Sequence, residues 1–147
     1  MATPVSRDWD RLKRMGRCLK ARPRLIQKFR WQEWHDVVEV DGDTDYAGCT
    51  ESRKSTSGGC VFWGKHYLKY WSKTQATIAL SSGESELMGM VKAASEGLGV
   101  TALMRDLGIE VTGTVATDSA AALGIASRQG LGKVRHLDVN LLWVQQQ

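Results

Sequence analysis

Three acidic residues, Asp43, Glu86 and Asp118, stand where their side chains could act together. Asp43 follows a short β-branched run, Glu86 lies in the first two turns of a predicted long helix, and Asp118 ends a later predicted strand. Functional sites collect at the C-terminal ends of adjacent strands in such sheets. Carboxylates are preferred ligands of Mg²⁺, and two such ions about 3.5–4 Å apart can promote phosphodiester cleavage. The pattern therefore favours a site for divalent cations.

Each acidic residue also has a purely structural explanation. Asp43 could form a turn, because aspartate is favoured there, and Asp118 with Ser119 could cap the following helix. Glu86 is harder to explain in this way, because Glu84 already suits a capping box with the serine three residues before it. Taken singly, the residues favour the structural explanation. Together, in this order, they favour a metal site.

The elements that must position these residues follow one another after residue 36. Three strands, a long helix, a fourth strand and further helices describe a mixed sheet with helices packed on it, which is an α/β fold. The second and third strands form a predicted hairpin. We predict strands at 37–40, 60–63, 67–71 and 111–117, a long helix at 82–107, a short helix at 120–127 and a helix from 136 to the end.

The long helix is expected to pack on the sheet along one apolar stripe. Its apolar residues recur at steps of three or four, which is typical of a helix with a single buried face. Gly97 and Gly99 each cost about 1 kcal/mol relative to alanine in a helix, so packing must stabilise it. The predicted stripe comprises Leu87, Val91, Ala94, Leu98 and Ala102.

Charge is unevenly distributed along the 147 residues, whose formal net charge is +4. Residues 1–30 carry ten basic and two acidic residues, whereas the remainder carries ten basic and fourteen acidic ones. A basic segment raises affinity for polyanions without reading their sequence, although it could equally be a solvated helix face. We expect a basic helical segment over 1–34 and an α/β domain over 35–147.

Composition excludes several classes of protein. Hydrophobic residues make up 42% and charged residues 24% of the chain, which disfavours wholesale disorder. Apolar runs fall short of the roughly 18 residues that a membrane span needs, and the charged N-terminus lacks the apolar core of a secretory signal, so no membrane partner is expected. Three cysteines without C-x-x-C spacing argue against a disulfide scaffold or zinc ribbon and favour a reducing compartment.

Four motifs follow one another between residues 43 and 138. They are Asp-Thr-Asp-Tyr-Ala-Gly-Cys at 43–49 with Arg-Lys-Ser-Thr-Ser-Gly-Gly at 53–59, Trp-Ser-Lys-Thr-Gln-Ala-Thr-Ile-Ala-Leu-Ser-Ser-Gly-Glu-Ser-Glu at 71–86, Thr-Asp-Ser-Ala-Ala-Ala at 117–122 and Arg-His-Leu-Asp at 135–138. In this order they resemble the ribonuclease H domain of copia-type retrotransposon Pol polyproteins. The likeness covers residues 37–147, and residues 7–31 resemble the preceding segment, where the reverse transcriptase part ends.

The resemblance implies a ribonuclease H-like fold and cleavage of the RNA strand of RNA–DNA hybrids with two Mg²⁺ ions, for which Mn²⁺ could substitute. Asp43, Glu86 and Asp118 match the first three catalytic and metal-binding positions of the family. The implied partners are an RNA–DNA hybrid and the other parts of the Pol polyprotein. The implied location is intracellular, in cytoplasm or nucleus, or in virus-like particles if the element is active.

Substrate contact is expected from a further set of polar residues. The basic ones could equally be ordinary solvated charges, and the histidine could instead begin a helix. The set comprises Arg53, Lys54, Lys73, Ser119, Arg135 and His136.

The sequence departs from the family pattern at its end. The family continues into one more strand and a final helix that bears a fourth acidic residue, and we expect this chain to lack both. The strand at 111–117 should then be an exposed sheet edge. The alternatives to a hybrid ribonuclease are an inactive nucleic-acid-binding remnant and a different metal nuclease that cuts DNA. The three acidic residues favour catalysis, and the missing end favours the remnant.

Overall fold

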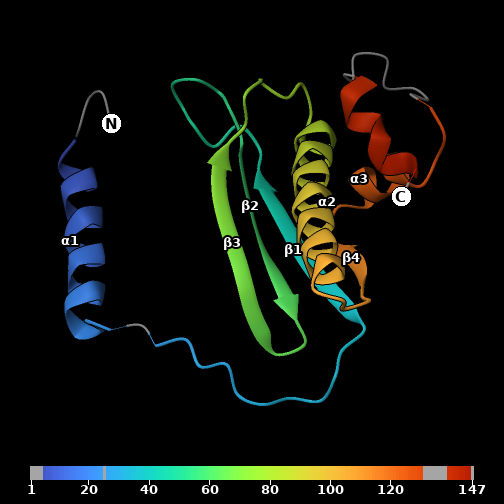
Figure 1. The fold of residues 1–147 in the computed structure, drawn as a ribbon. Coiled ribbons are helices and arrows are strands. Elements are labelled where there is room, and N and C mark those ends of the chain that lie inside the picture. Colours follow the sequence, from blue (N-terminus) through green and yellow to red (C-terminus); the bar gives the residue numbers. More distant parts are fainter. Residues whose placement is uncertain (1–4, 25, 131–138, 147) are drawn as a thin grey trace. The chain divides into compact units, whose positions relative to one another are not determined.

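The structure is a computed structural model that describes residues 5–24, 26–130 and 139–146 (Figure 1). None of the helices in these ranges is long and apolar enough to cross a membrane. The elements, in chain order, are α1 (Ser6–Ala21), β1 (Val37–Asp45), β2 (Thr56–Trp63), β3 (His66–Thr74), α2 (Ser82–Asp106), β4 (Thr112–Ala116), α3 (Ala120–Ala126) and the 3₁₀ helix η1 (Val139–Gln146).

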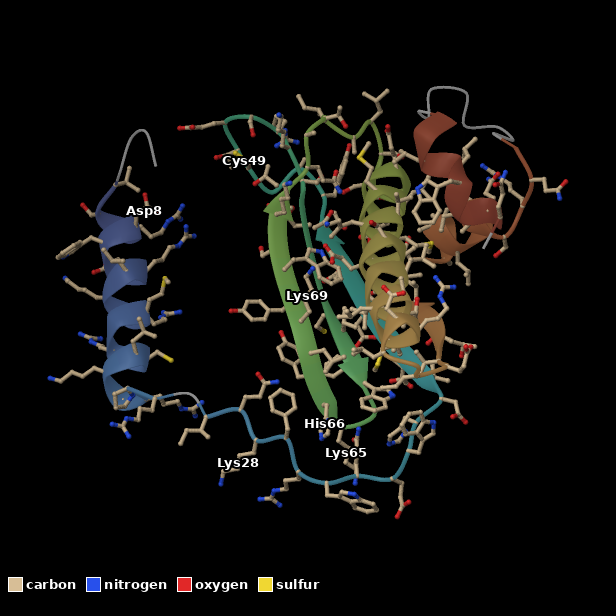
Figure 2. The ribbon with its side chains drawn as sticks, viewed as in Figure 1. Asp8, Lys28, Cys49, Lys65, His66 and Lys69 are labelled. Carbon is tan, nitrogen blue, oxygen red and sulfur yellow. The ribbon has the colours of Figure 1, made fainter. Side chains whose placement is uncertain are left out.

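The chain divides into two compact units, Met1–Trp31 and Gln32–Gln147. Gln32 is the first residue of the second unit, and its side chain binds the turn between β2 and β3. Its Nε2 donates to the Trp63 carbonyl at 2.9 Å, and its Oε1 accepts from the backbone N–H of Lys65 at 2.7 Å. Lys65 and His66 are labelled at this turn in Figure 2. The division therefore falls three residues before the predicted one.

The first unit contains α1, which lies within the segment over 1–34 that was expected to be basic and helical. Asp8 lies in its first turn and accepts a hydrogen bond from the backbone N–H of Val5 at 3.1 Å. At its end, the backbone N–H of Arg22 donates to the Cys18 carbonyl at 3.0 Å, and Pro23 follows. No residue of α1 is buried, so both its apolar and its basic side chains are accessible within this unit.

The second unit is built on a four-stranded mixed sheet with the order β3-β2-β1-β4. The pairs β1–β2 and β2–β3 are antiparallel, and Gly64, with a φ of +57°, makes the turn of the predicted hairpin. The pair β1–β4 is parallel, because α2 carries the chain back across the sheet between β3 and β4 (Figure 1). The predicted α/β architecture with a mixed sheet is confirmed.

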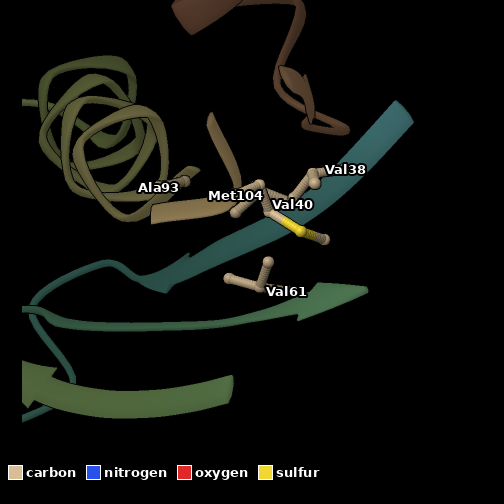
Figure 3. Packing of buried hydrophobic residues seen from close by; sticks show 5 residues of the cluster. All are labelled: Val38, Val40, Val61, Ala93 and Met104. Atoms are coloured by element: carbon tan, nitrogen blue, oxygen red, sulfur yellow. The ribbon is translucent and has the colours of Figure 1, made fainter. Parts of the chain in front are cut away.

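The main core lies between α2 and the two central strands. Val38 and Val40 of β1 and Val61 of β2 are fully buried and pack with Ala93 and Met104 of α2 (Figure 3). Residues alternate between the two faces of a strand, so every second residue of β1 turns toward the helix. This packing fixes α2 over β1.

The buried face of α2 differs from the predicted stripe. The prediction is wrong at Leu98, whose side chain is 47% exposed. Gly97 is buried instead. A Cβ at this position would lie only 2.9 Å from Cγ2 of Val40, so a larger residue would not fit without a shift. The glycine thus permits close contact between helix and strand. The buried residues of α2 are Glu84, Ser85, Leu87, Gly89, Met90, Ala93, Ala94, Gly97 and Met104.

Strand β4 forms one edge of the sheet among the described residues, as the sequence predicts. All five of its residues are exposed, and its sequence, Thr-Gly-Thr-Val-Ala, carries no charge. Charged side chains and prolines are common means of preventing edge strands from pairing with other chains. This edge has neither, so its free N–H and C=O groups can pair with another strand.

Candidate metal centre

Two of the predicted acidic residues lie where the parallel strands β1 and β4 end. The last residues paired between these strands are Asp41 and Ala116. Asp43 and Asp118 each lie two residues beyond that pair. Because parallel strands run in the same direction, both side chains belong to the same end of the sheet.

Helix α2 contributes the third carboxylate to this end of the sheet. Glu86 lies in its second turn and is half-buried. Asp43, Glu86 and Asp118 each offer one carboxylate oxygen, and these oxygens lie within 4.8 Å of one another. Residues that are far apart in the sequence are thus brought together by a strand, a helix and the loop after another strand.

The cap of α3 is formed by Ser119 and leaves the Asp118 carboxylate free for another role. The Ser119 hydroxyl accepts a hydrogen bond from the backbone N–H of Ala122 at 3.2 Å. Asp118 itself is exposed. At the end of β1, Oδ1 of Asp43 accepts from the backbone N–H of Thr44 at 2.7 Å, which restrains that carboxylate.

The cap of α2 is formed by Ser81 and Glu84, and Glu86 takes no part in it. The Ser81 hydroxyl accepts from the backbone N–H of Glu84 at 3.2 Å. Oε2 of Glu84 accepts from the backbone N–H of Leu80 at 2.6 Å, one residue earlier than in a standard capping box. The two glutamates therefore have the separate positions that the sequence indicates.

The carboxylate cluster is electrostatically unfavourable by itself. Burial raises the pKa of Glu86, and the nearby charges of Asp43 and Asp118 raise it further. Oxygen ligands of this kind suit Mg²⁺ or Mn²⁺, and a divalent cation would neutralise the repulsion. The donor set therefore fits a hard divalent cation held by these three residues.

This arrangement predicts a pH dependence of folding stability. Because the pKa of Glu86 is raised on folding, the protonated form favours the folded state, and its contribution is lost as the pH rises through the folded-state pKa. Without metal, Glu86 should therefore lower the melting temperature by a growing amount as the pH rises from about 4, near the ordinary glutamate pKa. Glu86→Gln should weaken that dependence. Thermal melts of both proteins in a chelator measure it.

At neutral pH, added Mg²⁺ should reverse the loss of stability. A ligand that binds only the folded state stabilises it by about 2.7 kcal/mol at a concentration of 100 Kd. Melts with and without MgCl₂ would contradict the cluster as a cation site if the wild type and Glu86→Gln responded equally.

The residues expected to contact substrate do not all lie beside the carboxylates. Lys73 is near the end of β3, which is the sheet edge opposite β4. Arg53 and Lys54 lie in the loop between β1 and β2, where Arg53 has a φ of +56°. Ser119 is next to Asp118 but is engaged in the cap of α3. The remaining two, Arg135 and His136, lie outside the described residues.

A separate cavity of about 550 Å³ lies on another side of α2. Glu84 and Met88 of α2 line it together with Lys73 and Gln75, whereas Glu86 does not. Successive helix residues are rotated by about 100°, so Glu84 and Glu86 point in different directions. The sequence assigned no role to Gln75, although this residue belongs to the second of the four motifs and is buried.

Comparison with known proteins finds relatives of three kinds. Secreted RxLR effector protein 161 of Plasmopara viticola is 36% identical over 109 residues, which are 69% of this chain and 71% of that protein. An uncharacterized mitochondrial protein of Arabidopsis thaliana is 34% identical over 98 residues, 65% of this chain and 40% of that protein. The retrovirus-related Pol polyprotein from transposon RE2 of the same plant is 30% identical over 115 residues, 76% of this chain and 8% of the polyprotein. No protein-family model matches the chain.

Proposed function

Because the chain belongs to a retrotransposon-derived family that includes Pol polyproteins of the copia type, we propose that it is a metal-dependent endonuclease that cleaves the RNA strand of RNA–DNA hybrids. The chain spans about two fifths of the mitochondrial relative and under a tenth of the polyproteins. The mixed sheet flanked by helices is compatible with a ribonuclease H-like fold.

The observation that carries this proposal is the convergence of Asp43, Glu86 and Asp118 within 4.8 Å. Divalent cations held by these residues would supply an activated water and stabilise the leaving oxygen of a phosphodiester. The chain itself supplies position and negative charge. Asp43 is restrained by the Thr44 N–H, Glu86 by its place in a packed helix, and Asp118 by its place between β4 and α3.

The basic first unit supports a nucleic-acid substrate. Residues 1–30 carry ten basic residues against two acidic ones, and no residue of α1 is buried. Such a segment binds phosphate backbones with an affinity that falls as salt concentration rises. It would add affinity for a hybrid without taking part in cleavage.

The deciding experiment offers purified protein three labelled duplexes in Mg²⁺: an RNA–DNA hybrid, duplex RNA and duplex DNA. We expect cleavage of the RNA strand in the hybrid alone, and no cleavage in a chelator. Cleavage of duplex DNA would instead identify a DNA nuclease on this fold. Binding of the hybrid without any cleavage would identify an inactive nucleic-acid-binding remnant.

Two glutamates of α2 provide a sharper prediction. Glu84→Gln should retain most of the cleavage rate, because a glutamine oxygen can still accept from the Leu80 N–H. Glu86→Gln should reduce the rate by about 100-fold or more, since even residues that only orient metal ligands matter by about 10–100-fold. Single-turnover rates for the two variants test this division of roles, and equal losses would contradict it.

A further inference from the structure

We propose that Gln75 is a positioning residue that holds Glu86 and Asp43 in register with each other; this inference rests on the proposed function of the carboxylate site. Gln75 immediately follows β3 and is 9% exposed. Its backbone N–H donates to the Ser55 carbonyl at 2.8 Å, which ties the residue to the segment that enters β2. Its side chain then reaches between the sheet and the start of α2.

One hydrogen bond of the Gln75 amide holds the helix. Nε2 donates to the carbonyl oxygen of Ser85 at 2.9 Å. Ser85 is 1% exposed and immediately precedes Glu86. Because this bond fixes a backbone atom in the first turns of α2, it opposes rotation of the helix about its axis. Such a rotation would swing Glu86 away from the two aspartates.

The second hydrogen bond of the same nitrogen holds the sheet. Nε2 also donates to the Ser57 hydroxyl at 2.9 Å. Ser57 is paired with Thr44 across β2 and β1, and the Thr44 hydroxyl donates to the Ser57 hydroxyl at 3.3 Å. Thr44 in turn follows Asp43 and restrains its carboxylate through the backbone N–H. The amide therefore links the neighbour of Asp43 to the neighbour of Glu86.

Close packing makes this link stiff. Gly89 lies one turn after Ser85, and a Cβ at Gly89 would overlap the hydroxyl oxygen of Thr44. The Thr44 side chain thus lies directly against the backbone of the helix at Gly89. The side chains on the sheet side of the amide, Ser57 at 5% and Thr44 at 7% exposure, are buried as well. A small displacement at Gln75 is therefore transmitted to both carboxylates.

Glutamine suits this position because one nitrogen carries two donors. Glutamate has the same length, but as a carboxylate it donates no hydrogen bond and would add negative charge near the cluster. Methionine has a similar length and no donor. The Gln75 amide oxygen is buried without a hydrogen-bond partner among the described residues. Gln75→Met therefore removes only the two bonds that Nε2 donates.

The test measures Mn²⁺ affinity of the full chain by electron paramagnetic resonance, with Mn²⁺ as the only added ligand. We expect Gln75→Met to weaken Mn²⁺ binding by about 10–100-fold, the usual effect of losing a residue that orients metal ligands. The kcat for a hybrid should fall while its KM stays near the wild-type value. The matched control is Val38→Ala, a core change at the far end of β1 that should lower the melting temperature but leave Mn²⁺ affinity unchanged.

A second variant covers the case in which Gln75→Met does not fold. Ser57→Ala removes the acceptor on the sheet side and keeps the bond to Ser85, so it should weaken Mn²⁺ binding less but in the same direction. Wild-type Mn²⁺ affinity in the Gln75 and Ser57 variants, or an equal loss in Val38→Ala, would overturn the positioning role. Failure of the wild-type chain to bind Mn²⁺ would also overturn the positioning role. If the wild type binds Mn²⁺ and Gln75→Met does not, but no hybrid is cleaved, the ribonuclease proposal fails and the positioning role stands.

Discussion

Replacing Asp118 with asparagine is expected to abolish Mg²⁺-dependent cleavage of an RNA–DNA hybrid, with a loss of about 100-fold or more. Residues that only orient metal ligands already matter by about 10–100-fold, and Asp118 would be a ligand itself. The fold should persist, because Asp118 is exposed and Ser119 provides the helix cap. Cleavage rates and circular dichroism spectra of the two proteins measure these effects.

The same substitution should stabilise the metal-free protein at neutral pH. Asp118 is one of the two charges that raise the pKa of Glu86, so removing it relieves repulsion in the folded state. Asp106→Asn, an exposed change at the opposite end of α2, is the matched control and should alter neither cleavage nor the Mg²⁺ response. Retention of full activity by Asp118→Asn would refute the role assigned to this carboxylate.

Replacing Leu87 with alanine is expected to lower the free energy of unfolding more than any of the other substitutions proposed above. Leu87 is fully buried and packs against Ile125 of α3, with Val91 and three residues of η1 around it. Removing a buried leucine side chain typically costs about 2–5 kcal/mol, which is a large share of the roughly 5–15 kcal/mol that a domain has. Because α3 begins two residues after Asp118, loosening it should also weaken cation binding.

Leu98→Ala is the matched control for that prediction. It makes the same chemical change on the same helix, but Leu98 is 47% exposed, so the cost should be well below that at Leu87. Denaturant unfolding of both variants gives the comparison. Equal losses at the two positions would mean that α2 packs differently from the arrangement described above.

The contrast between Leu87 and Leu98 also marks how far sequence analysis can reach. The periodic spacing of apolar residues correctly predicts a long helix after residue 81, and the order of strands and helices correctly predicts a mixed α/β sheet. The spacing of apolar residues alone does not identify which residue of each helical turn is buried against the sheet. The buried positions Gly97 and Met104 depend on where β1 and β2 lie beneath the helix, which is long-range information.

The candidate site was predictable to a similar extent. Strand ends and motif order single out Asp43, Glu86 and Asp118, because chemistry and position in the elements agree. The role of Gln75 could not be derived in this way. Its partners Ser57 and Ser85 lie on separate elements, and nothing in the local sequence reports a bond between them. Likewise, Gln32 joins the second unit through bonds to a distant turn.

The parallel pairing of β4 with β1 has a consequence for the order of folding. Antiparallel neighbours β1, β2 and β3 are joined by short connections, whereas β4 reaches β1 after a chain segment that contains two strands and α2. Closing so long a loop costs entropy before its contacts compensate, and such non-local pairings form slowly. We therefore expect β4 to dock last. Since Asp118 arrives with β4, newly made chains would bring Asp43, Glu86 and Asp118 together only when β4 docks, and cation binding would report that this step has occurred.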